Sequence, residues 1–168
     1  MTATMRVLRL PAQPDLDTLA VSTEAIPAPG PGEVLLRVRA SSLNYHDYLV
    51  VGGLIPQPAG RIPMSDGAGE IAALGSGVGG WSVGDRAMGA FFPDWTGGAP
   101  TDANTAAISG ETIDGFAAEF AVVPAHSLCR MPAGWSFAEA ATLPCAGLTA
   151  WRALRVEGQL EVGATVLL

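Results

Sequence analysis

A row of chemically capable side chains runs from Asn44 to Tyr48, within the stretch "SSLNYHDYLVVGG". The amide of Asn44 and the phenols of Tyr45 and Tyr48 can donate hydrogen bonds, and the imidazole of His46 can donate or relay a proton near neutral pH. Such a row suits a metal site, proton transfer or cofactor binding. A polar turn that only satisfies its own backbone would have the same composition. The residues alone leave these four interpretations open.

Metal binding requires more ligands than this row supplies. His46 and His126 lie 80 residues apart, and neither has a neighbouring ligand at a spacing that known metal sites use. The two cysteines, Cys129 and Cys145, are too few for a disulfide framework or a four-thiolate zinc site. Cys145 occurs in the apolar stretch "LPCAGL", where burial would keep a thiol unreactive. We therefore expect Cys145 to be a packing residue.

A glycine motif, "GSGVGG", matches G-x-G-x-x-G through Gly75, Gly77 and Gly80. Phosphate binding by this motif requires the loop to open directly into a helix, whose N-terminal amides hold the phosphates. The residues that follow, "WSVGDRAM", have no helical period and contain a Gly-Asp turn. The pattern therefore predicts a turn between two antiparallel strands.

The elements that position these residues are mainly strands. Short alternating or clustered apolar runs predict strands over 5–10, 19–26, 32–42, 68–75, 84–92 and 115–123. Residues 93–114 are rich in Gly, Thr, Ala and Asp and are expected to form a long loop. Near the end, helices are predicted over 136–143, where Ser136 and Glu139 have the spacing of a capping box, and over 146–156.

The composition points to one mainly β domain and narrows the classes of partner. The chain has 168 residues, of which 21 are glycine and 13 proline, and a net charge of -7. Scattered basic residues give no positive stripe for nucleic acid or anionic membranes, so neither is expected as a partner. There is no run of about 20 apolar residues and no secretion signal, so a cytoplasmic location is expected.

The last six residues, "GATVLL" at 163–168, resemble a buried parallel strand. Such a strand needs neighbours on both edges and cover on both faces. This chain offers no such neighbours for residues 163–168. We therefore expect the chain to be the front part of a longer polypeptide, truncated where an α/β domain begins.

Five motifs occur in a familiar order: "SLNYHDYLVVGG", "PMSDGAGEIAALGSGV", "WSVGDRAMGAFFPDW", "DGFAAEFAVVP" and "ATLPCAGLTAWRAL". With them the chain resembles the medium-chain dehydrogenase/reductase superfamily, in particular its zinc-free, quinone-oxidoreductase-like and alcohol-dehydrogenase-like members. The resemblance covers nearly all residues. It implies a GroES-like, partly closed β-barrel as the catalytic domain over 1–135, a helical connection over 136–162, and the first strand of an absent Rossmann domain over 163–168.

The resemblance also implies that zinc is not used. In zinc-dependent relatives a cysteine stands at the place of Asn44, a His-Glu pair at the places of Ser65 and Asp66, and a further ligand at the place of Cys145. Only the thiol of Cys145 and the carboxylate of Asp66 keep the chemistry of a zinc ligand. The long loop has no cysteine, so the four-cysteine structural zinc lobe is absent as well.

Site residues follow from the same resemblance. Asn44 and Tyr45 should lie near the nicotinamide, and Thr149 should reach the cofactor from the first turn of a helix. We therefore expect Asn44, Tyr45 and Thr149 to bind the cofactor. Asn44, Tyr45 and His46 are the expected catalytic residues, because their donors can stabilise the oxyanion or enolate formed during hydride transfer.

Neighbouring residues receive weaker roles. Some quinone reductases carry a tyrosine at the place of Leu49, so Tyr48 is not identified as the proton donor. Asp47 is expected to orient a neighbour or to bind backbone amides of the turn. Three aromatic residues just past a strand are candidates for the substrate pocket: Phe91, Phe92 and Trp95.

The function expected for the parent polypeptide is zinc-independent, NAD(P)-dependent oxidation and reduction of an alcohol or aldehyde, a quinone or an enone. NAD(P)H, with NADPH favoured, would be bound mainly by the missing domain, and the chain alone would lack turnover. The partners expected are a small-molecule substrate and, in the complete protein, a second copy in a homodimer. The alternatives are a non-catalytic GroES-like binding or assembly module and a zinc enzyme with substitute ligands.

Overall fold

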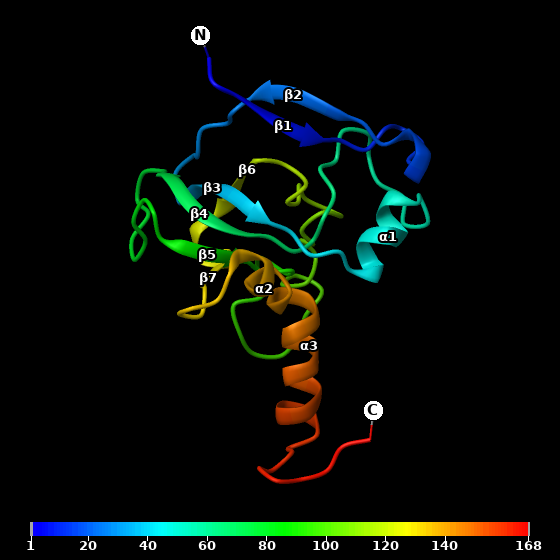
Figure 1. The fold of residues 1–168 in the computed structure, drawn as a ribbon, viewed down its shortest axis with the longest axis vertical. Helices are drawn as coiled ribbons and strands as arrows, with labels where there is room; N and C mark the ends of the chain where they lie inside the picture. The colour runs from blue at the N-terminus through cyan, green and yellow to red at the C-terminus, as the bar shows by residue number, and fades with distance from the viewer. Residues whose placement is uncertain (1, 168) are drawn as a thin grey trace.

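The computed structural model describes residues 2–167 and confirms a mainly β fold with short helices (Figure 1). The strands are β1 (Thr4–Leu8), β2 (Val21–Ala25), β3 (Glu33–Ala40), β4 (Ala68–Leu74), β5 (Arg86–Gly89), β6 (Phe120–Pro124) and β7 (Leu128–Arg130). The helices are α1 (Tyr45–Val51), α2 (Phe137–Ala141) and α3 (Leu148–Trp151). Short 3₁₀ turns occur at η1 (Leu16–Thr18) and η2 (Ala125–Ser127), and π-helical turns at η3 (Leu143–Gly147) and η4 (Arg152–Glu157).

Two antiparallel sheets make up the body of the molecule. One has five strands in the order β6-β3-β4-β5-β7, and the other pairs β1 with β2. The segment just before β6 joins them, because Leu8 N donates to Ala117 O and Glu119 N donates to Arg6 O. These two hydrogen bonds therefore link the two sheets along β1.

The main core is built mostly from residues on the strands of the five-stranded sheet. Val34 and Leu36 of β3 and Ile71 of β4 are almost fully buried, as the two-residue period of strands requires. The ring of Phe116 fills the centre so closely that a Cβ on Gly67 would overlap it. This close approach explains a glycine at the entry to β4.

The glycine motif behaves as predicted from the sequence. It forms the turn between β4 and β5, which pair antiparallel, and no helix follows it. Ser136 caps α2, since its Oγ accepts from Glu139 N and Glu139 Oε2 accepts from Ser136 N, which confirms the capping box. Residues 93–114 form the expected long loop, without a helix or strand.

Two elements were not predicted from the sequence. The row beginning at Tyr45 is the seven-residue helix α1 rather than a turn, and it is held by burial of Val50 and Val51 against Leu10. The strand β7, only three residues long, pairs with β5. Both are shorter than the windows over which hydrophobic periodicity can be read.

Helix α2 packs on the five-stranded sheet through Ala140 and Ala141, and α3 with the turn after it leads away from the sheets (Figure 1). Residues 164–167 beyond them have no regular structure, and Leu168 lies outside the described residues. The strand expected at 163–168 and its place in a further domain therefore stay predictions. The domain boundaries expected after residues 135 and 162 stay predictions as well. A parallel strand forms only beside neighbouring strands.

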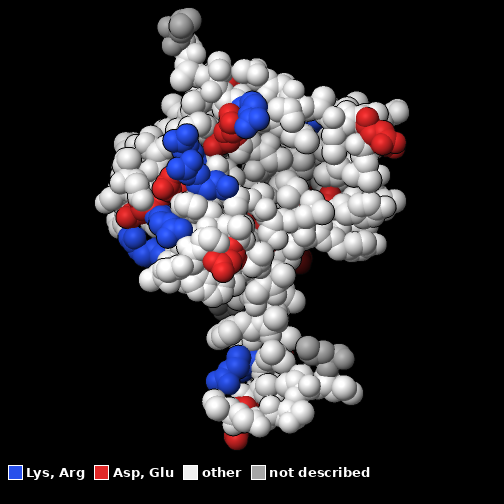
Figure 2. All heavy atoms as spheres, viewed as in Figure 1, with Lys and Arg blue, Asp and Glu red and all other residues white. Residues whose placement is uncertain are grey.

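Charged side chains alternate in sign on the face shown in Figure 2, where arginines lie beside acidic residues. Arg9 pairs with Glu24 at 2.7 Å and Arg39 with Glu70 at 2.9 Å.

Over the described residues, every helix is too short or too polar to cross a membrane.

Candidate functional site

The carboxylate of Asp47 organises the start of α1. Its Oδ2 accepts a hydrogen bond from Asn44 N at 2.8 Å, and its Oδ1 accepts one from Ser65 N at 2.7 Å. Asp47 is 1% exposed, so its carboxylate lies in the interior. Asp47 thus fixes the N-terminus of α1 against the segment that enters β4. Binding of backbone amides is one of the two roles expected for Asp47 from the sequence.

The side chain of Asn44 joins the same two segments. Its Nδ2 donates to Asp66 Oδ2 at 2.8 Å and to Ser65 Oγ at 3.1 Å. An amide nitrogen carries two hydrogens, so both are used within the protein. From the sequence this NH₂ group is expected to serve the substrate; in the structure it donates to Asp66 and Ser65 instead. The oxygen, Asn44 Oδ1, faces the backbone N–H of Asp47 in the capping box of α1, and its second lone pair is left for a ligand.

Asp66 is buried with an incomplete set of partners. It is 0% exposed, and Asp66 Oδ1 has no hydrogen-bond partner within residues 2–167. Burial raises the pKa of this carboxyl to about 6, the bond from Asn44 opposes the rise, and the charge of Asp47 adds to it. Asp66 therefore holds a proton far more readily than an ordinary aspartate.

The thiol of Cys145 lies in the field of the same carboxylates. Burial, then the charges of Asp66 and Asp47, raise the pKa of Cys145. The expected unreactive thiol therefore has a physical basis. Cys145 is half-buried, however, and it lines a cavity rather than the core.

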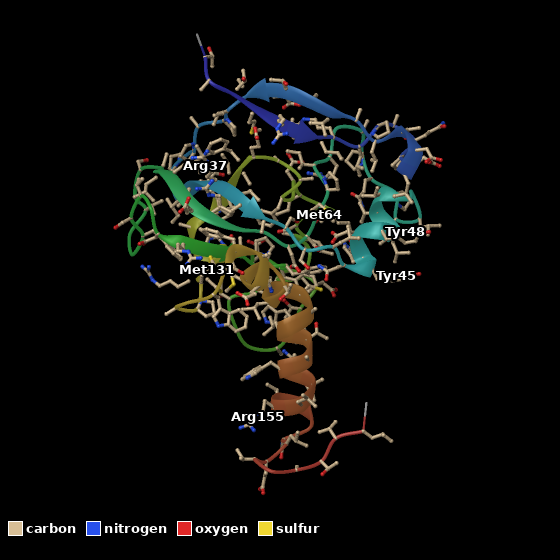
Figure 3. All side chains as sticks on the ribbon, viewed as in Figure 1. Arg37, Tyr45, Tyr48, Met64, Met131 and Arg155 are labelled. Atoms are coloured by element: carbon tan, nitrogen blue, oxygen red, sulfur yellow. The ribbon has the colours of Figure 1, made fainter. Side chains whose placement is uncertain are left out.

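Tyr45 and Tyr48 project from the outer face of α1 (Figure 3). Their rings stack at 5.9 Å between centroids, and Tyr45 is 76% exposed. Neither phenol is hydrogen-bonded to Asn44 or Asp66, so Tyr45 is available to a molecule that approaches from outside the domain.

His46 points to the long loop. Its Nε2 lies 3.0 Å from Glu111 Oε2, although the ring N–H is not aligned for a hydrogen bond. The ring contacts Phe91 edge to face, at 5.2 Å between centroids. Sequence reasoning missed Glu111, because nothing in a loop of low periodicity marks a partner that is 65 positions from His46.

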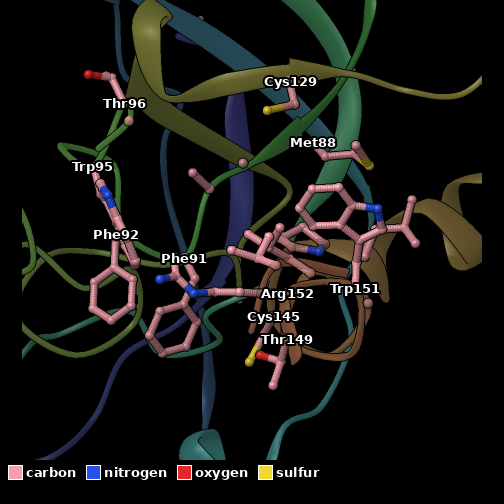
Figure 4. A pocket seen from close by; sticks show the side chains of 18 of the residues that line it. Met88, Phe91, Phe92, Trp95, Thr96, Cys129, Cys145, Thr149, Trp151 and Arg152 are labelled. Carbon is pink, nitrogen blue, oxygen red and sulfur yellow. The ribbon is translucent and has the colours of Figure 1, made fainter. Parts of the chain in front are cut away.

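An open cavity of about 800 Å³ lies between the loop and the helical segment (Figure 4). Thr149 and Cys145 line it from the helical side, and Phe91, Phe92 and Trp95 line it from the loop. The three aromatic residues expected at a substrate pocket are thus brought together with Thr149. Asn44, Tyr45 and His46 do not line this cavity, and His46 adjoins it only through Phe91.

The donor set does not fit a zinc ion. A cation among Asn44, Ser65, Asp66 and Cys145 would face the two hydrogens of the Asn44 amide, and only one carboxylate and one thiol would be left as ligands. Throughout the described part of the chain, no three His, Cys, Asp or Glu side chains group closely enough to hold a metal.

Comparisons with known proteins agree with this architecture. The family model for the alcohol dehydrogenase GroES-like domain matches residues 30–133. A zinc-type alcohol dehydrogenase-like protein of Schizosaccharomyces pombe is 45% identical over 141 residues, which are 82% of this chain and 41% of the relative.

Solved structures show the same likeness. A cobalt- and zinc-bound thermostable alcohol dehydrogenase from Pyrobaculum aerophilum has a TM-score of 0.78 and 34% identity, over 89% of this chain and 47% of its own. An NAD-dependent alcohol dehydrogenase has a TM-score of 0.81 and 31% identity, over 94% and 48%. The chain thus spans about half the length of these relatives or less. It belongs to the alcohol dehydrogenase GroES-like domain family and, through it, to the medium-chain dehydrogenase/reductase superfamily.

Proposed function

We propose that this chain is the catalytic domain of a zinc-independent, NAD(P)-dependent oxidoreductase, which moves a hydride between nicotinamide and an alcohol or aldehyde, a quinone or an enone. One observation carries the proposal: the Asn44 amide donates both hydrogens to Ser65 and Asp66, where zinc-dependent relatives carry metal ligands. A neutral amide there leaves polarisation of the reacting oxygen to hydrogen-bond donors.

The donors in question lie at the start of α1. The phenol of Tyr45 is exposed, and the side chain of His46 is 20% exposed. Each can donate to an oxygen on which negative charge builds up. Asn44 Oδ1 adds an acceptor that can hold a hydroxyl or a carboxamide NH₂ group. The bound nicotinamide would supply the hydride.

The cofactor fits this chain at one end only. Thr149 lines the cavity, and Asn44 Oδ1 keeps one lone pair beyond its contact with the Asp47 N–H, so each offers a polar atom to a nicotinamide. The glycine-rich turn between β4 and β5 is not followed by a helix, so it lacks the amides that hold phosphates. The phosphates would be bound by the rest of the polypeptide, and the isolated chain should show no turnover.

The test measures nicotinamide oxidation by the whole polypeptide across a panel of quinones, enones and aldehydes, with and without a chelator. We expect activity that the chelator leaves unchanged, while a zinc-containing dehydrogenase treated in parallel loses activity. Loss of activity under chelation would contradict the metal-free proposal. No turnover on any substrate would favour the binding-module alternative.

A second measurement assesses Asn44 itself. Asn44→Ala removes the acceptor at Oδ1 and also the donor that Asp66 uses. We expect the rate of turnover to fall by a larger factor than the folding equilibrium constant. Equal factors would reduce Asn44 to a structural residue.

A further inference from the structure

The cavity between the long loop and the helical segment suits a small flat molecule. Its volume of about 800 Å³ lies in the range of small-molecule sites, which are about 300–1,000 Å³. Phe91, Phe92, Trp95 and Trp151 supply aromatic surface to its walls. Aromatic walls favour planar apolar ligands, because rings stack offset or edge to face.

One charged residue, Arg152, lines this cavity within the part of the chain that the structure describes. Its guanidinium lies 5.2 Å from the centroid of the Trp95 ring, and Figure 4 shows the side chain reaching towards the aromatic residues of the loop. Stacking on an indole holds a guanidinium in a fixed plane, with its N–H groups presented at the edge.

The donors of Arg152 are mostly unused. Nη2 donates to Glu157 Oε1 at 3.0 Å, and this partner is 65% exposed. Over residues 2–167, Nε and Nη1 of Arg152 have no hydrogen-bond acceptor. A guanidinium has five N–H donors in a fork that matches a carboxylate. Arg152 can therefore bind an anion in the cavity without giving up an interior contact.

The electrostatic character of this helical segment reverses from Arg152 towards Cys145. Cys145 and Thr149 lie close together (Figure 4), and burial, followed by the charges of Asp66 and Asp47, raises the pKa of the Cys145 thiol. An anionic group would be repelled from the Cys145 end and attracted to Arg152. A ligand with one neutral and one anionic end would thus bind in a single orientation.

We infer that this cavity binds a flat, aromatic alcohol or carbonyl compound that carries a carboxylate, with the carboxylate on Arg152 and the reacting oxygen at the Cys145 end of the cavity. The inference rests on the proposed function, because it names the substrate class of the proposed enzyme. It concerns binding, so it can be measured without turnover.

The experiment is an NMR titration of the 168-residue chain with para-(hydroxymethyl)benzoate and, separately, with neutral benzyl alcohol. Alcohols do not react with the two thiols. The four tryptophan indole N–H signals report the site: Trp95 and Trp151 line the cavity, whereas Trp81 and Trp135 do not. We expect both ligands to shift only the first pair. The carboxylate should lower Kd by about tenfold, as expected for a hydrogen bond to a charged group.

Three variants separate Arg152 from general charge effects. Arg152→Gln should abolish the preference for the carboxylate. Arg155→Gln removes the same charge from the same segment outside the cavity and should leave the preference unchanged. Glu157→Gln replaces the competing carboxylate by a neutral amide, a weaker acceptor for Arg152, and should increase the preference.

The inference is overturned if the two ligands bind equally to the unmodified chain, or if Arg155→Gln acts like Arg152→Gln. It is also overturned if nicotinamide mononucleotide competes for the site with the same dependence on Arg152, since the guanidinium would then serve the cofactor phosphate. Carboxylate-selective binding to a whole polypeptide that lacks turnover would refute the proposed function and support the site. Turnover without any preference for carboxylates would do the opposite.

Discussion

Replacing Asp66 by asparagine tests the electrostatics of the site directly. The folded-state pKa of Asp66 is raised from 3.8 to about 6, mainly by burial. The native protein therefore binds this proton more tightly than the unfolded chain does. The stabilisation from the bound proton is complete below the unfolded pKa of 3.8 and is lost as the pH rises towards about 6.

The magnitude follows from the same values. A rise from 3.8 to about 6 corresponds to on the order of 3 kcal/mol, because each tenfold step in proton affinity is worth about 1.4 kcal/mol. Asp66 is 0% exposed, so solvent screening reduces this value little. Ionised Asp66 thus lowers the free energy of unfolding at pH 7 relative to pH 4.

Urea unfolding of the unmodified chain and of Asp66→Asn, at intervals from pH 4 to pH 7.5, measures the effect. Other carboxylates act on both proteins alike, so the difference between their unfolding free energies isolates Asp66. We expect that difference to shift in favour of the variant by on the order of 3 kcal/mol over this range. Asp102→Asn, at an exposed loop position, is the control and should follow the unmodified chain. A difference that does not vary with pH would refute the reasoning.

Two further predictions concern packing and the thiols. Gly67→Ala should destabilise the chain by about 1–3 kcal/mol in urea unfolding, because its Cβ would overlap Phe116. In the control Gly79→Ala, the new Cβ meets no atom within 4 Å and should change stability little. Equal effects of the two substitutions would contradict the close approach of Phe116 to Gly67. With a chromogenic disulfide reagent at pH 8, exposed Cys129 should react roughly tenfold faster than Cys145, whose pKa is raised. Comparable rates, or a fast remaining thiol in Cys129→Ser, would show that Cys145 is not protected.

The strands and the helix cap could be predicted because their signals are local. The alternating apolar residues of β3 and the three-residue spacing of Ser136 and Glu139 act within a single element. The helix α1 could not, since Leu49 is the only one of its seven residues with a high helix propensity. Its stability comes from Asp47 and from the contact of Val50 with Leu10, which joins distant parts of the chain.

Candidate side chains could be named from the sequence, but their geometry could not. Asn44 was expected to offer its amide hydrogens to a substrate, because sequence shows which donors exist and not which are already used. The acceptors Ser65 and Asp66 lie 21 and 22 positions away. Glu111 beside His46, and Arg152 above Trp95, are likewise products of folding. Partners at such separations leave no periodic signal in one sequence.

The response of Asp66 to added zinc also separates the two mechanisms that this fold could support. A carboxylate that binds a divalent cation has its pKa lowered, because the cation favours the charged form. The Asn44 amide carries no net charge, so it only partly offsets burial, and the pKa of Asp66 rises. Adding zinc to the chain should therefore leave the pH dependence of stability unchanged if the amide has replaced the metal. If zinc instead removed or reversed the loss of stability between pH 4 and pH 7, Asp66 would be a metal ligand, and the metal-free proposal would fail.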